Sequence, residues 1–348
     1  MCQAPSKVMN TLFGQRLSIV VWPWTPTERE ESTMRTTYRD ALPQLDGTFL
    51  MTDGGVETDL IFNRGWDLPA FATFPLLDSD DGRAELSSYL DDYVDIAREH
   101  QIGLLLETFT WRANPDWAAS IGYDLERMEQ VNREAVEFLV ELRTGRASDL
   151  AHLVISGCLG PRSDGYVAAD IMDVDTARRY HARQIGVFAD SEADLVSALT
   201  MTNVEEAIGI TQAAVAAEIP AVISFTVETD GRLPSGQALG DAVRQVDAVT
   251  DGAPAYFMIN CAHPTHFAQV LEGGEEWTAR IQGLRTNAST KSHAELDESA
   301  TLDAGDPADL AARHAALREF VPGMAVLGGC CGTDSRHVRE IVGAWLRA

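Results

Sequence analysis

Eight short apolar segments recur along the chain, and longer segments separate them. They cover residues 48–52, 102–106, 152–156, 194–199, 221–225, 256–260, 280–284 and 324–327. Two of the intervening segments, 86–100 and 128–142, carry apolar residues three and four positions apart, which is the spacing of an amphipathic helix. Strands that alternate with helices form a parallel sheet, and eight of them favour closure over an open doubly wound sheet. The sequence therefore predicts an α/β fold, a single-domain (β/α)8 TIM barrel.

The length of the chain fits this fold without a second domain. A (β/α)8 barrel needs about 250 residues, and the chain has 348, of which 45% are hydrophobic. We expect residues 1–44 to form an N-terminal extension, partly disordered, and residues 45–348 to form the barrel. Alternatively, the first residues reflect an upstream start, with Met34 as the true initiator.

The charge of the chain argues against two classes of partner. The net charge of −26 at pH 7 repels the phosphates of nucleic acid and anionic membrane surfaces, and no run of Lys or Arg offsets it locally. The apolar stretch at residues 17–22 is too short to span a bilayer. Five cysteines are too few for a disulfide scaffold and fit a reducing compartment. We therefore expect a cytoplasmic protein with small-molecule partners, and the sequence is compatible with a homo-oligomer.

Residues suited to binding and catalysis follow the predicted strands directly. They are Asp53-Gly54-Gly55, Glu107-Thr108, Gly157-Cys158, Thr226, Cys261, Asn287 and Cys330-Cys331. Positions after parallel strands lie on the C-terminal rim of a barrel, where (β/α)8 enzymes carry their active sites. The sequence thus predicts one site at this rim.

Three of the five cysteines follow the sixth and eighth predicted strands at this rim. Cys330 and Cys331 are in a Gly-Gly-Cys-Cys-Gly turn, whose glycines let the chain leave the strand so that both sulfurs can reach one point. Cys261 follows the sixth predicted strand, and the curvature of a barrel brings it to the same mouth. Three thiolates with one open position are typical of a catalytic zinc site, so we predict that these three cysteines bind Zn2+. Each of them, taken alone, could instead be a small buried hydrophobic residue.

Other candidate ligands have weaker support. His263 and His266 follow Cys261 closely, but we expect them to line the rim or to form hydrogen bonds away from the metal. Cys158 is expected to pack at the rim rather than to supply a fourth sulfur.

A zinc ion with three sulfur ligands indicates one kind of chemistry. Three thiolates quench much of the Lewis acidity of the ion, so it activates water poorly, which argues against a zinc hydrolase. It can still hold a fourth thiol as a thiolate near pH 7, where a free thiol with a pKa of about 8.5 is mostly protonated. The site therefore predicts S-alkylation, in which a substrate thiolate attacks an electrophilic carbon.

The same motifs resemble those of a known family. Asp53-Gly54-Gly55, Asn260-Cys261 and Gly328-Gly329-Cys330-Cys331-Gly332-Thr333 are similar, in order and spacing, to motifs of the homocysteine S-methyltransferase family, and the likeness covers residues 45–348. The resemblance implies a (β/α)8 barrel in which the three cysteines hold zinc and zinc holds homocysteine.

The resemblance also implies substrate-binding roles for other rim residues. Asp53 and the Gly54-Gly55 turn would bind the carboxylate of the amino acid through backbone N–H groups, unless the glycines only permit a tight turn. Glu107 and Thr108 would bind the ammonium and carboxylate or orient the zinc site, unless Glu107 is a solvated charge.

Two asparagines complete the predicted site. Asn260 and Asn287 would order the rim loops or bind a polar group of the substrate.

Several positions depart from the family pattern. Many relatives have Gly where this chain has Glu57, and an acidic residue that relatives use for the amino group of homocysteine falls on Leu199. A tyrosine that some members place near zinc falls on Arg112. A carboxylate lost at Leu199 could be replaced by Glu57 or Glu107, and a different thiol acceptor is an alternative.

The predicted activity follows from these observations. We expect a zinc-dependent S-methyltransferase that moves a methyl group from S-methylmethionine, S-adenosylmethionine or betaine to homocysteine, giving methionine. These donors are cationic, so an aromatic edge formed by Trp66, Trp111 and Trp117 would suit them. The alternatives are the same chemistry on another thiol or selenol, and a non-catalytic barrel that binds zinc or an amino acid.

Overall fold

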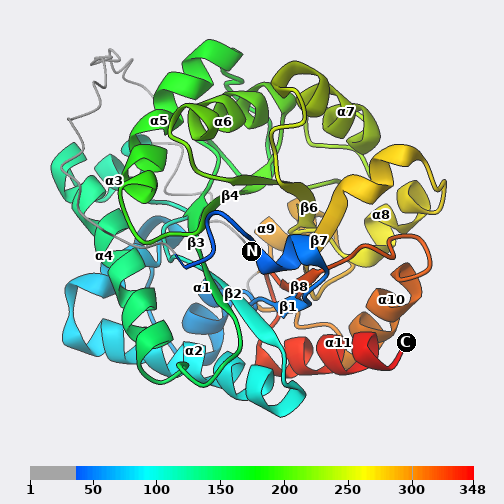
Figure 1. Cartoon of the computed structure of the whole chain (residues 1–348), viewed down its shortest axis with the longest axis horizontal. Helices are drawn as coiled ribbons and strands as arrows, with labels where there is room; N and C mark the ends of the chain where they lie inside the picture. The colour runs from blue at the N-terminus through cyan, green and yellow to red at the C-terminus, as the bar shows by residue number, and fades with distance from the viewer. Residues whose placement is uncertain (1–36, 300) are drawn as a thin grey trace.

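The computed structural model describes residues 37–299 and 301–348, and eight parallel strands close into a barrel in chain order (Figure 1). The strands are β1 (Leu50–Met51), β2 (Gly103–Glu107), β3 (Leu153–Leu159), β4 (Leu195–Met201), β5 (Ala221–Phe225), β6 (Tyr256–Asn260), β7 (Ile281–Thr286) and β8 (Val326–Gly329). Each overlaps one of the eight predicted segments. The predicted (β/α)8 barrel is confirmed.

Eleven α-helices lie in the described part of the chain, and the longer ones surround the barrel (Figure 1). They are α1 (Val56–Thr58), α2 (Asp80–His100), α3 (Pro115–Ser120), α4 (Leu125–Thr144), α5 (Val174–Ala189), α6 (Val204–Ala216), α7 (Leu239–Thr250), α8 (Pro264–Leu271), α9 (His293–Asp297), α10 (Pro307–Leu317) and α11 (Ser335–Arg347). The two predicted helical segments fall inside α2 and α4. Both helices begin earlier than predicted because side-chain caps, Ser79 and Asp124, bond to their first turns.

The strands are apolar because both of their faces are covered. The inward-pointing side chains of seven strands fill one end of the barrel together with Leu42, and they form a closed apolar layer of Leu50, Leu105, Val154, Leu195, Val222, Tyr256, Met258 and Val326. A larger apolar layer lies between the strands and the helices. Since this end of the barrel is filled, the site is left to the opposite end, at the C-terminal ends of the strands.

The first described residues lie across the filled end of the barrel. The amides of Thr37 and Tyr38 donate to Oδ1 of Asp194, at 3.0 and 2.8 Å, and the Arg39 guanidinium donates to the carbonyl oxygen of Ala193. In Figure 1 this segment is the blue trace in the middle of the barrel. Residues 37–44 of the predicted extension are therefore packed on the barrel, while residues 1–36, including Met34, lie outside the described residues. The boundary at residue 45 stays a prediction.

Helix length and hydropathy bear on the membrane prediction. Among the described residues, no helix is both long and apolar enough to cross a membrane.

Candidate active site

A cavity opens at the C-terminal ends of the strands. Its volume, with its open mouth, is about 580 Å3. Its wall includes residues that follow β1, β2, β6 and β8 and residues within the C-terminal parts of β2, β3, β4, β6 and β7. The predicted site residues that line it are Asp53, Gly54, Gly55, Glu57, Glu107, Thr108, Asn260, Cys261, Cys330 and Cys331. Of the predicted set, Asn287 alone is not part of this wall. The cavity is the point at which motifs from opposite ends of the sequence meet.

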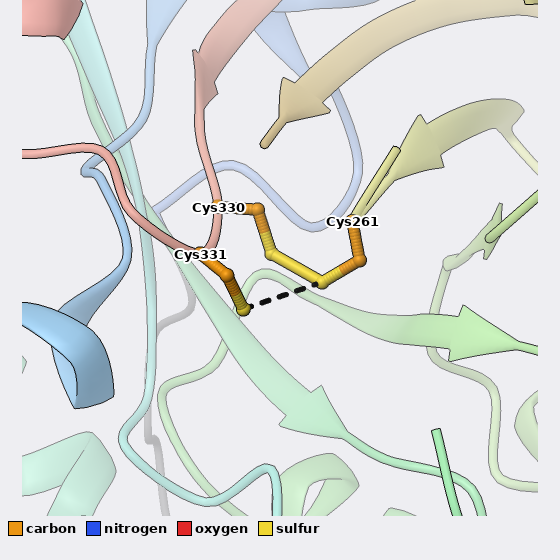
Figure 2. Close-up of side chains that lie close together, drawn as sticks. All are labelled: Cys261, Cys330 and Cys331. Atoms are coloured by element: carbon orange, nitrogen blue, oxygen red, sulfur yellow. Dashed lines mark hydrogen bonds between the residues drawn. A yellow bond between two sulfur atoms is a disulfide. The ribbon is translucent and has the colours of Figure 1, made fainter. Parts of the chain in front are cut away.

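Cys261, Cys330 and Cys331, here called the cysteine cluster, converge on one side of this cavity (Figure 2). Their three sulfur atoms all lie within 4.8 Å of one another. Cys261 and Cys330 form a disulfide with Cα atoms 5.5 Å apart, and Cys331 Sγ lies 3.9 Å from Cys261 Sγ. The structure thus brings together sulfurs that are 69 residues apart in sequence.

The loop after β6 is held so that the Cys261 side chain faces Cys330 and Cys331. Cys261 has a φ of +53°, a left-handed conformation that is strained for a residue with a side chain. Its N–H donates to the carbonyl of Arg285 at 3.0 Å, and its carbonyl oxygen accepts from Asn287 Nδ2 at 2.9 Å. His293 Nε2 lies 2.8 Å from the same carbonyl oxygen. These contacts hold the turn that takes the sulfur out of the strand direction, so Asn287 orders the loop from behind.

The Gly54-Gly55 turn packs against the other cysteine loop. A Cβ on Gly55 would overlap the carbonyl oxygen of Cys330, and one on Gly54 would lie 2.7 Å from Tyr93 Oη. The Gly55 N–H donates to the carbonyl of Thr333 at 3.0 Å. Glycine is therefore needed here for close backbone approach, and binding of a substrate carboxylate by this turn stays a prediction.

Asp53 is part of a buried ion pair that the sequence did not reveal. Arg285 Nη2, from β7, lies 2.6 Å from Asp53 Oδ1, and the other carboxylate oxygen accepts from Tyr89 Oη at 3.0 Å. Burial lowers the pKa of Arg285, but the charges of Asp53 and Glu107 outweigh that effect and raise it. Arg285 is thus a fixed positive charge in the wall of the cavity.

Glu107 ends β2 inside the cavity and is 7% exposed. Burial raises the pKa of its carboxyl to about 7, although the charge of Arg285 and the hydroxyls of Ser156 and Ser197 favour the ionised form. Neither carboxylate oxygen has a hydrogen bond of good geometry. Glu107 is a buried acid rather than a solvated charge, and its neighbour Thr108 joins strands, since Thr108 Oγ1 accepts from the Cys158 amide at 2.8 Å.

Glu57 is held by the segment that follows the glycine turn. Its Oε1 accepts from Thr73 Oγ1 at 3.0 Å, and burial raises the pKa of the carboxyl. With Asp53 and Glu107, it gives the cavity wall three acidic side chains against the one base Arg285.

The predicted aromatic edge is filled by a side chain of the protein itself. The Arg112 guanidinium carbon lies 4.2 Å from the ring centre of Trp111 and 3.7 Å from that of Trp117. Burial lowers the pKa of Arg112 to about 10, which leaves it charged at neutral pH. Trp66 packs against the apolar layer around the barrel instead of lining the cavity. Of the three predicted tryptophans, Trp111 alone lines the cavity.

Asn260 supports the backbone beside the cluster. Its Oδ1 accepts from the Thr200 amide at 2.8 Å and from Ser224 Oγ at 2.6 Å, and its Nδ2 donates to Thr200 Oγ1 at 2.8 Å. Thr200, at φ +64°, follows Leu199 in the cavity wall, and its hydroxyl lies 3.9 Å from Cys261 Sγ. Asn260 thus ties the C-terminal ends of β4 and β5 to the end of β6, and its two predicted roles stay predictions.

Replacing Asn260 with alanine is expected to lower the free energy of unfolding by about 2–3 kcal/mol, because it leaves buried hydrogen-bonding groups of Thr200 and Ser224 without partners. Denaturant unfolding followed by circular dichroism measures this. Asn63→Ala is the control, since its amide makes one bond to Asp59 from an exposed position, and a change of about 0.5 kcal/mol or less is expected. Equal losses in the two variants would contradict the supporting role.

Two residues near the cluster were missed in the sequence. Tyr166 Oη lies 3.6 Å from Cys331 Sγ, and its ring stacks on His293 with centres 3.8 Å apart. Tyr166 lies in the loop after β3 and His293 is the first residue of α9, and the strand pattern does not define the path of either segment.

The weaker candidates lie outside the cluster. His263 Nδ1 accepts from the Thr265 amide at the start of α8, and His266 Nε2 lies 2.9 Å from the carbonyl oxygen of Thr290. Cys158 is buried in the cavity wall as a free thiol. Among the described residues, the metal-ligand group found at this site consists of the three cysteines alone.

Comparison with known proteins identifies the family that the sequence motifs resemble. The family model described as homocysteine S-methyltransferase matches residues 50–345. Homocysteine S-methyltransferase 4 of Zea mays is 25% identical over 325 residues, which is 86% of this chain and 90% of the relative. A selenocysteine Se-methyltransferase of Brassica oleracea var. italica is 22% identical over 324 residues, 85% of this chain and 88% of the relative.

A solved structure agrees in fold. The metallated form of the homocysteine methyltransferase MmuM from Escherichia coli superposes with a TM-score of 0.67 at 20% identity, over 88% of this chain and 99% of that one. Together with the family match, this defines the chain as a methyltransferase built on a (β/α)8 barrel. It belongs to the homocysteine S-methyltransferase family.

Proposed function

We propose that this chain is a zinc-dependent S-methyltransferase that transfers a methyl group from a sulfonium or ammonium donor to homocysteine, giving methionine. S-methylmethionine, S-adenosylmethionine and betaine are the candidate donors. One observation carries the proposal: three cysteine sulfurs from the loops after β6 and β8 lie within 4.8 Å of one another in the wall of the cavity. The names of the relatives support homocysteine as the acceptor.

The donor set of the cluster fits zinc. Zn–S bonds are about 2.3 Å long in tetrahedral sites, which places two sulfur ligands about 3.8 Å apart. Cys261 Sγ and Cys331 Sγ are 3.9 Å apart. In their reduced form, Cys261, Cys330 and Cys331 would hold the ion and leave one position for a substrate sulfur. Zinc bound there would keep the acceptor thiol ionised near neutral pH.

The side chains of the cavity complete the reaction environment. The acidic excess of Asp53, Glu57 and Glu107 over Arg285 favours entry of a cationic donor. In the transfer, the acceptor sulfur forms a bond to the methyl carbon as the bond from that carbon to the donor sulfur or nitrogen breaks. The electron pair of the broken bond stays on the donor, which leaves as a neutral thioether or amine.

A cross-screen of acceptors and donors tests this function. Metal-quantified protein is assayed with homocysteine, selenocysteine, cysteine and glutathione, each paired with the three donors, and methylated products are detected by mass spectrometry. We expect the highest kcat/KM with homocysteine. A higher value for selenocysteine would support the second candidate, which the Brassica relative favours. Zinc-loaded protein that is inactive with every pair would overturn the proposal and favour a binding role.

A further inference from the structure

Two buried groups of opposite charge line the cavity without complete partners. Glu107 is 7% exposed, and neither of its carboxylate oxygens has a hydrogen bond of good geometry. Arg285 is 5% exposed, and its Nη1 has no hydrogen-bond partner. Buried charged groups are costly unless they are paired and hydrogen-bonded, so such atoms in a cavity wall indicate a ligand that satisfies them.

The position of the Arg285 guanidinium is fixed by its other nitrogens. Nη2 donates to Asp53 Oδ1 at 2.6 Å and to the carbonyl of Gly54 at 3.2 Å, and Nε donates to the carbonyl of Gly329 at 3.2 Å. These contacts leave one nitrogen, Nη1, for a ligand. An arginine held in this way loses little side-chain freedom when it binds.

Glu107 and Arg285 influence each other but do not pair. The charge of each shifts the pKa of the other toward the ionised form. The ion pair of Arg285 is made with Asp53, and no ion pair joins Arg285 to Glu107 among the described residues. A ligand with a positive and a negative group on neighbouring atoms would supply hydrogen-bond partners to both side chains.

We propose that Glu107 and Arg285 bind the α-amino acid group of the acceptor, with the ammonium on the Glu107 carboxylate and the carboxylate on Arg285 Nη1. This pair is here called the zwitterion clamp. The inference rests on the proposed function, because it takes the acceptor to be an amino-acid thiol. It assigns substrate recognition to Arg285, a residue that the family motifs did not indicate, and does not use the occupied N–H of Gly55.

The clamp serves the acceptor rather than the donor because of its place beside the cysteine cluster. The carbonyl of Arg285 accepts the Cys261 N–H at 3.0 Å, and the guanidinium bonds to Gly329, the residue before Cys330. In this proposal, an amino acid held there directs its side-chain sulfur toward the cluster. Arg112, the other buried arginine of the described residues, is enclosed by Trp111 and Trp117 and does not line the cavity.

Calorimetry with three thiols tests the clamp without turnover. The zinc-loaded protein is titrated with L-homocysteine, with 4-mercaptobutyrate, which lacks the amino group, and with 3-mercaptopropylamine, which lacks the carboxylate. The wild-type protein is expected to bind homocysteine at least about 10-fold more tightly than either analogue. In Glu107→Gln, the affinity for homocysteine is expected to fall about 10-fold or more, while the affinity for 4-mercaptobutyrate stays the same. In Arg285→Lys, the affinity for the two ligands that carry a carboxylate is expected to fall, and the affinity for 3-mercaptopropylamine is expected to stay the same.

Other patterns would overturn the clamp. If Glu107→Gln lowers the affinity for homocysteine and for 4-mercaptobutyrate equally, or raises only the KM of the donor, then Glu107 does not bind the ammonium of the acceptor. The outcomes are also separable from those of the proposed function. Failure of methyl transfer with every donor, with the analogue pattern intact, would refute the activity and leave the clamp standing.

A stability measurement separates binding from a structural role. A carboxyl whose pKa rises on folding, here from 4.5 to about 7, binds its proton more tightly in the folded state. Ionised Glu107 therefore opposes folding increasingly as the pH rises from about 4.5 to about 7. Its charged and titratable neighbours are Arg285, Asp53, Cys158 and Tyr256.

Glu107→Gln is accordingly expected to have a higher urea midpoint than the wild type at pH 8 and a smaller advantage at pH 5. Weaker homocysteine binding combined with higher stability would support the clamp. A lower midpoint than the wild type at pH 8 would show that Glu107 serves the fold and would contradict the proposal.

Discussion

Replacing Cys261 with serine is expected to remove zinc from the protein and to lower methyl transfer by more than about 100-fold. Loss of a residue that only orients a metal ligand typically costs about 10–100-fold, and Cys261 is proposed to be a ligand itself. Its sulfur is the member of the cluster that comes from β6, so neither Cys330 nor Cys331 can take its place. Metal content per chain and turnover with homocysteine measure the two effects.

Cys158→Ser is the matched control for metal content. Cys158 is also a buried cysteine in the cavity wall, but it is not a member of the cysteine cluster. Its replacement is expected to leave the zinc stoichiometry unchanged. A Cys261→Ser protein that loses zinc and still transfers methyl groups at the wild-type rate would contradict the proposed mechanism.

Replacing Asp53 with alanine is expected to lower the free energy of unfolding by about 3–5 kcal/mol. Asp53 and Arg285 are 5–6% exposed, and the variant leaves the arginine charge buried without its carboxylate. The loss of the bond from Tyr89 to the same carboxylate adds to the effect. Guanidinium unfolding followed by fluorescence measures the change.

Two further variants separate the buried charge from other causes. Asp53→Ala combined with Arg285→Met removes both charges and is expected to recover much of the stability, since apolar replacements of a buried pair are often tolerated. Asp149→Ala breaks the exposed pair with Arg98 and is expected to leave the unfolding midpoint unchanged. A single Asp53→Ala variant as stable as the wild type would show that the ion pair does not contribute to folding.

The barrel could be predicted from the sequence because its strands are buried on both faces. Such strands are continuous apolar segments that differ from the amphipathic helices between them, as β5 (Ala221–Phe225) differs from α4 (Leu125–Thr144). The cysteine cluster could be predicted for a related reason. Once the strand order is known, Cys261 and Cys330 must emerge at the same end of the barrel.

The buried charges could not be predicted in the same way. Asp53 and Arg285 are 232 residues apart, and their pairing depends on the closure of the barrel. Arg285 did leave one signal, since it is a charged residue inside the otherwise uncharged strand β7 (Ile281–Thr286). The stack of Tyr166 on His293 and the enclosure of Arg112 depend on loop conformations, for which the sequence pattern gives no spacing rule.

Because the three sulfurs are divided between the loops after β6 and β8, binding of the proposed zinc ion would depend on the completion of folding. A growing chain that has reached the end of β7 carries only one of the three sulfurs. The full coordination sphere can assemble only after the last strand has inserted beside β1, whose two residues pair with both neighbours. Binding of the proposed zinc ion would therefore be a late event in folding, and a molecule that retained it would have a closed barrel.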